Sequence, residues 1–120
     1  MIIIQSQRLK SRILSALSDS NMHSILQSTS FTDKSANDII RTQGLPHSTT
    51  YRKINELIKC GLLVLYRSEI TGGKKIAYYK STFRSIKVSY EGITDTKIEA
   101  EPNKDALQRI SNLFYDLKEE

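Results

Sequence analysis

The chain has 120 residues, of which 38% are hydrophobic, so it is long enough for one domain of ordinary size. No apolar run approaches the ~20 residues of a membrane span, and residues 1–4 lack the regions of a signal peptide, so we expect a cytoplasmic protein. A single cysteine, Cys60, excludes an internal disulfide, and two distant histidines, His23 and His47, supply few ligands for a metal.

The formal net charge is +5, and the basic residues are concentrated in the middle of the chain. Between residues 34 and 87 there are eleven basic and three acidic side chains, whereas the rest of the chain has seven and ten. This distribution favours a surface that binds a polyanion. A solvated lysine-rich surface is the alternative.

The first half of the chain has the apolar spacing of helices. We predict four helices, over residues 8–18, around 22–26, 36–43 and about 49–60. Ser35 is the expected N-cap of the third helix, and Gly44 is its expected left-handed end. Ser48 is expected to cap the fourth helix, which Gly61 ends.

The second half changes to short apolar runs that are typical of strands. Residues 62–66 and 76–79 predict two strands, and Thr71-Gly72-Gly73 predicts the turn of a hairpin between them. Residues 85–100 predict a further strand pair. Pro102-Asn103 is expected to cap a last helix over residues 104–118.

Three segments in this order carry a family resemblance: SANDII at residues 35–40, LPHSTTYRKI at 45–54 and LIKCGLL at 57–63. With the glycine hairpin behind them, they resemble the winged helix-turn-helix of ArsR-like and MarR-like prokaryotic transcription regulators, especially archaeal ones. The resemblance covers about residues 8–80. We therefore expect an α+β fold with a three-helix core and a β-hairpin wing, followed by an extra strand pair and a C-terminal helix.

The expected organisation is a DNA-binding domain over residues 1–84 and a dimerisation extension over 85–120. Many regulators of the resembled type are homodimers that bind half-sites about one DNA turn apart. The last predicted helix carries an apolar seam of about two heptads, made by Leu107, Ile110, Leu113, Phe114 and Leu117. This seam either packs on its own domain or forms a dimer with the first helix and residues 2–4.

The start of the fourth helix and the hairpin carry the candidate DNA-binding residues, because a helix fits the major groove and its first turns can reach phosphates and base edges. These residues are His47, Ser48, Thr49, Tyr51, Arg52, Lys53, Arg67, Lys74 and Lys75. Arg52 is the best candidate for a base contact, since its planar fork can pair with guanine, and its alternative is an ion pair with Glu56. Lys74 and Lys75 either contact phosphate or keep the hairpin soluble. Thr50 is expected to face the core.

Other chemistry has no support in the sequence. Metal-sensing members of the resembled family use paired cysteines or clustered histidines, which this chain lacks, so metal sensing is not carried over. We expect no cofactor and no enzymatic activity, because glycine-rich phosphate loops, nucleophile elbows and kinase signatures do not occur. No effector is assigned.

The predicted function is sequence-specific binding of double-stranded DNA by a homodimeric transcription regulator. The alternative is a winged helix that serves as a protein-interaction module within a larger complex. Salt-dependent binding of duplex DNA would distinguish the two functions, because a transcription regulator has to bind DNA and a protein-interaction module does not.

Overall fold

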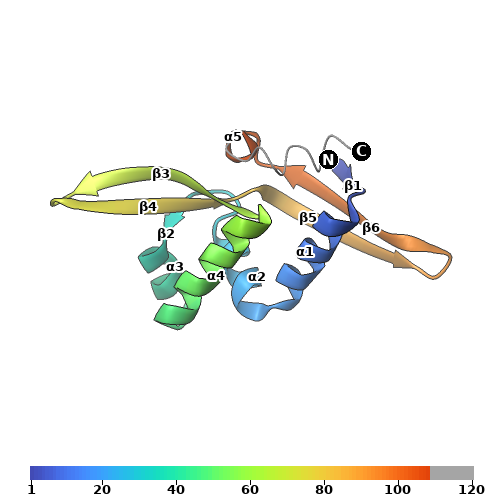
Figure 1. Ribbon diagram of the computed structural model, residues 1–120, viewed down its shortest axis with the longest axis horizontal. Helices are drawn as coiled ribbons and strands as arrows, with labels where there is room; N and C mark the ends of the chain where they lie inside the picture. The colour runs from blue at the N-terminus through green and yellow to red at the C-terminus, as the bar shows by residue number, and fades with distance from the viewer. Residues whose placement is uncertain (109–120) are drawn as a thin grey trace.

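Two β-hairpins form the ends of the molecule, and a layer of helices lies along one side between them (Figure 1). The computed structural model describes residues 1–108 and measures 56 × 27 × 20 Å along its principal axes. Its helices are α1 (Gln7–Ser18), α2 (Ser20–Ser28), α3 (Ala36–Gln43), α4 (His47–Cys60) and α5 (Lys104–Leu107). Its strands are β1 (Ile2–Ile4), β2 (Lys34–Ser35), β3 (Leu63–Thr71), β4 (Lys74–Ser81), β5 (Phe83–Glu91) and β6 (Thr94–Pro102). The fold is α+β, as the sequence predicts.

Local capping signals determine where most of the helices begin and end. The Asp19 carboxylate accepts a hydrogen bond from the Met22 N–H at the start of α2, and the Ser35 hydroxyl accepts one from the Asp38 N–H at the start of α3. Gly44, with φ of +65°, ends α3 in the left-handed conformation that was expected. Within residues 1–108 no helix has the length and apolar character that crossing a membrane requires.

The start of α4 differs from the prediction. The helix begins at His47, two residues earlier than expected, and Pro46 occupies the N-cap position without a side-chain hydrogen bond. The cause is the carbonyl of Pro46, which accepts hydrogen bonds from both the N–H and the hydroxyl of Thr50 and so closes the first turn. Ser48 therefore lies inside the helix, and its predicted role as the cap is wrong.

The β3–β4 hairpin extends well beyond the apolar runs that predicted it. Pairing continues through polar residues up to Thr71 and Lys74, and a two-residue turn of Gly72 and Gly73 joins the strands. Both glycines have positive φ, +59° and +79°, which matches the twist of a tight hairpin. Strand β2 pairs with β4 in a segment for which the sequence predicted no strand, and this places the start of α3 beside the hairpin.

The second sheet has the strand order β1–β6–β5. The β5–β6 hairpin confirms the predicted strand pair, and β1 adds a strand that the sequence did not indicate. Ile4 pairs with Ile98 on β6, and both side chains are fully buried against the helices. Residues 2–4 thus pack within their own protomer.

One hydrophobic core joins the segments on both sides of the predicted boundary at residue 84. Ile98 and Ala100 on β6 belong to the same buried cluster as Leu9 on α1 and Leu57 on α4. Asn103 precedes α5, but its side chain makes no capping hydrogen bond; its Nδ2 donates to the carbonyls of Ser30 and Ser81. The predicted last helix is described only as far as α5, and Ile110, Leu113, Phe114 and Leu117 lie outside the described residues.

Candidate nucleic-acid interface

The first turn of α4 points away from the core. His47 and Ser48 are exposed and Thr49 is half-buried, whereas Thr50 is fully buried, as expected from its position next to the core-facing residues. The exposed ring of Tyr51 lies one turn along the same surface, with its centroid 5.0 Å from that of the His47 ring. The helix therefore presents hydroxyls, two rings and uncapped backbone N–H groups to solvent at one end.

Arg52 lies on this exposed surface. It forms the ion pair with Glu56 that the sequence offered as the alternative to a base contact. Its Nη1 is 3.1 Å from Oε1 of Glu56, and 59% of the arginine side chain remains exposed. An exposed pair at this spacing contributes only about 0.3–0.5 kcal/mol. A bidentate contact with guanine contributes about 1–3 kcal/mol of discrimination, so the guanidinium can exchange Glu56 for a base edge.

Lys53 is directed elsewhere. Its Nζ lies 2.6 Å from Oδ2 of Asp19 at the start of α2, and only 15% of its side chain is exposed. The hydrogen bond from Lys53, together with that from the Met22 N–H, lowers the pKa of the Asp19 carboxyl. The structure thus does not bring Lys53 to the surface that carries Ser48 and Arg52.

Lys74 and Lys75 extend this surface onto the hairpin. Both side chains are exposed just after the Gly72-Gly73 turn. They border a groove of about 340 Å³ together with Tyr51 of α4. No carboxylate of residues 1–108 lies within ion-pair distance of either ammonium group. The structure therefore brings Tyr51 of α4 to the same groove as two hairpin cations that have no ion-pair partner within the described residues.

Arg67 is held at the base of the hairpin by three neighbours. Its Nε lies 2.5 Å from Oδ2 of Asp33, its Nη1 contacts the Glu69 carboxylate, and its guanidinium lies 3.9 Å from the centre of the Tyr78 ring. Hydrogen bonds from Arg67 to Asp33 and Glu69 raise the pKa of its guanidinium. Arg67 is thus engaged in contacts that join β3 to the segment before β2.

The groove also contains residues that were not predicted as part of the site. Asn37 in the first turn of α3 and Tyr79 on β4 line it beside Lys75. They are brought there by β2, whose residues Lys34 and Ser35 pair with Tyr79 and Tyr78. A two-residue strand has no periodicity, so no sequence signal indicated this neighbourhood.

No family model matches the sequence, and no curated protein matches it either. The described part of the chain contains no group of three or more histidine, cysteine, aspartate or glutamate side chains that could hold a metal ion.

Proposed function

We propose that this protein is a winged helix-turn-helix regulator of transcription that binds double-stranded DNA. In this proposal α3 and α4 form the helix-turn-helix, and the β3–β4 hairpin is the wing. The observation that carries the proposal is the shared groove, at which Tyr51 in the exposed start of α4 meets Lys74 and Lys75, two cations without an ion-pair partner among residues 1–108. The excess of basic residues between positions 34 and 87 supports a polyanionic partner.

The proposed contacts follow from the chemistry of each group. The uncapped N–H groups at the start of α4, together with Ser48 and Thr49, would bind backbone phosphate as the helix enters the major groove. Arg52 would read a base edge. Lys74 and Lys75 would contact phosphates beside the groove, whereas Arg67 would hold the hairpin in place.

We further propose that two copies act together on two half-sites of one duplex, about one helical turn, ~34–36 Å, or a multiple of it apart. A homodimer would explain how a chain of 120 residues reads enough sequence for specificity, because each recognition helix covers only a few base pairs.

The test is a titration of labelled duplex DNA at several salt concentrations, followed by fluorescence anisotropy. Replacement of Arg52, Lys74 and Lys75 by alanine should weaken binding sharply. Loss of the two lysine contacts should reduce the slope of log affinity against log salt by about 1.8, since each phosphate contact contributes ~0.9.

A charge-matched variant with Arg8, Lys97 and Lys104 replaced by alanine is the control, because it also removes three positive charges but leaves the groove intact. It should bind nearly as the parent does. Equal losses in the two triple variants would contradict the proposed surface. Absence of salt-dependent binding by the parent would favour the protein-interaction module instead.

A further inference from the structure

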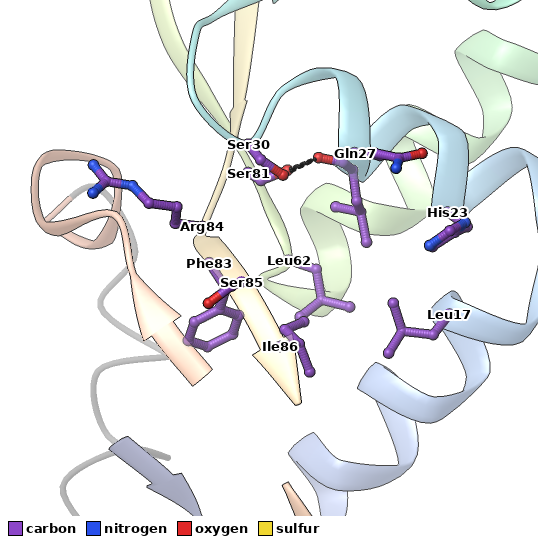
Figure 2. Close-up of a pocket in the computed structure, with 11 residues that line it drawn as sticks. Leu17, His23, Gln27, Ser30, Leu62, Ser81, Phe83, Arg84, Ser85 and Ile86 are labelled. Atoms are coloured by element: carbon purple, nitrogen blue, oxygen red, sulfur yellow. Dashed lines mark hydrogen bonds between the residues drawn. The ribbon is translucent and has the colours of Figure 1, made fainter. Parts of the chain in front are cut away.

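A small cavity lies between α1, α2 and the start of β5 (Figure 2). Its volume is about 160 Å³, and its apolar lining is made by Leu17, Leu26, Leu62, Phe83 and Ile86. His23, Gln27 and Ser85 contribute polar groups. A cavity of about 150 Å³ is large enough for a benzene ring, so this one fits a single aromatic or branched aliphatic side chain.

The far end of the β5–β6 hairpin exposes two side chains of that kind. Tyr90 is 79% exposed and Ile93 is 95% exposed at the hairpin tip. Side chains of a strand alternate between its two faces, so Tyr90 lies on the same face as Ile86 and Val88. The β6 residues that pair with Ile86 and Val88 are Ala100 and Ile98, and both are buried against the helices. The apolar face of the hairpin therefore continues beyond the helices that cover its base, which marks a surface for a partner.

Strand β5 connects the cavity to the tip and has one unpaired edge. It is the outer strand of its sheet, and within the described residues no strand pairs with its other side. From Phe83 at the cavity to Tyr90 at the tip there are seven residue steps, about 23 Å at ~3.3 Å per residue. A two-fold axis through the middle of the strand interchanges its ends, so the tip of each copy meets the cavity of the other.

The charges on the outer face of β5 are complementary under the same symmetry. Arg84 lies at the base, where it borders the cavity and its guanidinium is 5.6 Å from the centre of the Phe31 ring, and Glu91 lies at the tip. The two-fold axis brings Arg84 of one copy to Glu91 of the other. Lys87 lies near the axis and would meet its own copy; its cross-strand neighbour is Glu99, whose carboxylate is 3.8 Å from Lys97.

We propose that a second copy of this chain docks along β5 in the antiparallel direction, so that its Tyr90 fills the cavity between α1, α2 and β5 while its Ile93 packs at the edge of the cavity. A second copy is favoured over a small ligand because β5 lines the cavity at one end and carries Tyr90 at the other, and both charges lie on the same strand. The inference rests on the homodimer of the proposed function and assigns its interface, but it does not depend on DNA binding.

Sedimentation velocity of the purified full chain tests the interface. The parent is expected to be a dimer, and the Y90S/I93S variant is expected to dissociate with a dimer Kd raised about 30-fold or more, the effect of losing a central apolar anchor. The substituted side chains are exposed in the protomer, so circular dichroism should be unchanged. The control is Ile70→Ser on the other hairpin, where Ile70 is 80% exposed, and it should remain a dimer.

A charge exchange gives a second, independent readout. Arg84→Glu and Glu91→Arg should each weaken the dimer about 5-fold or more, and the double variant should recover most of the loss because the pair is restored with opposite polarity. A monomeric parent overturns the inference and leaves DNA binding to its own titration. A dimer that withstands Y90S/I93S also overturns it and places the interface elsewhere.

Discussion

Arg67 illustrates how neighbouring carboxylates decide which cations are available for the proposed contact with DNA. It contacts Asp33 and Glu69 and stacks on Tyr78, so its charge is already balanced within the protein. We expect Arg67→Gln to weaken DNA binding several-fold, because the hairpin loses its connection to the segment before β2. The slope of log affinity against log salt should stay the same, since no phosphate contact is lost.

The comparison variant is Lys74→Gln, which removes the same charge from a side chain without a carboxylate partner among residues 1–108. Its slope should fall by about 0.9. The measurement is fluorescence anisotropy over a salt series for both variants. A slope that also falls in Arg67→Gln would mean that Arg67 leaves its carboxylates to bind phosphate.

The Asp19 carboxylate makes two interactions at the start of α2, an N-cap and an ion pair with Lys53. Two substitutions distinguish their contributions to stability. The carboxylate accepts the Met22 N–H as the N-cap of α2 and pairs with Lys53 of α4 at 2.6 Å. Asp19→Ala removes both interactions and should lower the free energy of unfolding by about 1–2 kcal/mol, of which the cap contributes ~1 kcal/mol. Asp19→Asn keeps a capping oxygen and should cost less.

The same residue predicts a pH dependence. Because the pKa of Asp19 is lowered in the folded protein from its ordinary 3.8, the stabilisation is complete well above pH 3.8 and is lost as the pH falls through the folded-state value. Urea unfolding from pH 7 to pH 2 should therefore show the parent and Asp19→Asn converging in acid. A difference that stays constant over this range would exclude the carboxylate as its origin.

Residue roles were predictable where the signal is local. Ser35 and Gly44 were recognised from the sequence because each acts on a backbone group within a few residues of itself. The pairs Lys53–Asp19 and Arg67–Asp33 join residues 34 positions apart, and no local pattern encodes such contacts. The sequence therefore identified the basic residues but not which of them are engaged within the protein.

At the scale of elements, the turn of the β3–β4 hairpin is the most sensitive point. Gly72 and Gly73 both have positive φ, and a Cβ at either position would meet no atom within 4 Å, so only backbone strain opposes substitution. We expect Gly73→Val to loosen the hairpin and weaken DNA binding, because a β-branched residue rarely adopts this conformation. Global stability should change little, since the hairpin end is exposed.

Gly72→Asn is the matched variant, because asparagine followed by glycine is a preferred pair in this turn. It should keep both hairpin protection and DNA affinity near those of the parent. Hydrogen exchange of the β3 and β4 amides measures the protection of the hairpin, and fluorescence anisotropy measures the DNA affinity. Equal hairpin protection in Gly73→Val and Gly72→Asn would contradict the role of the turn.

Element prediction succeeded where length and caps supported it. Helix α3 has the predicted bounds because a serine cap and a left-handed glycine enclose its apolar positions. Strands β1 and β2, of three and two residues, were missed because their pairing partners are about 96 and 44 positions away, which is a tertiary effect. The start of α4 was misplaced because Pro46 replaces a side-chain cap.

At the scale of the whole molecule, the two hairpins separate two proposed contacts. The β3–β4 hairpin, with Lys74 and Lys75, and the β5–β6 hairpin, with Tyr90 and Ile93, lie at opposite ends of the long axis (Figure 1). The proposed DNA surface and the proposed dimer surface therefore share no residue. This separation allows the proposed dimer surface to be removed by substitution while the proposed DNA surface stays intact.

The final prediction uses that separation. The Y90S/I93S variant keeps Arg52, Lys74 and Lys75, so it should bind a duplex with a single half-site with the affinity of the parent. On a duplex with an inverted pair of half-sites, selected by the parent from random sequence, it should lose an advantage of about 10²–10⁴ that comes from two linked contacts.

Anisotropy with both duplexes at one fixed salt concentration measures this advantage directly, and the R84E/E91R double variant is the control because its interface should re-form. Loss of affinity for the single half-site as well would mean that the β5–β6 hairpin itself touches DNA. An advantage that survives in Y90S/I93S would mean that the two copies are joined through another surface.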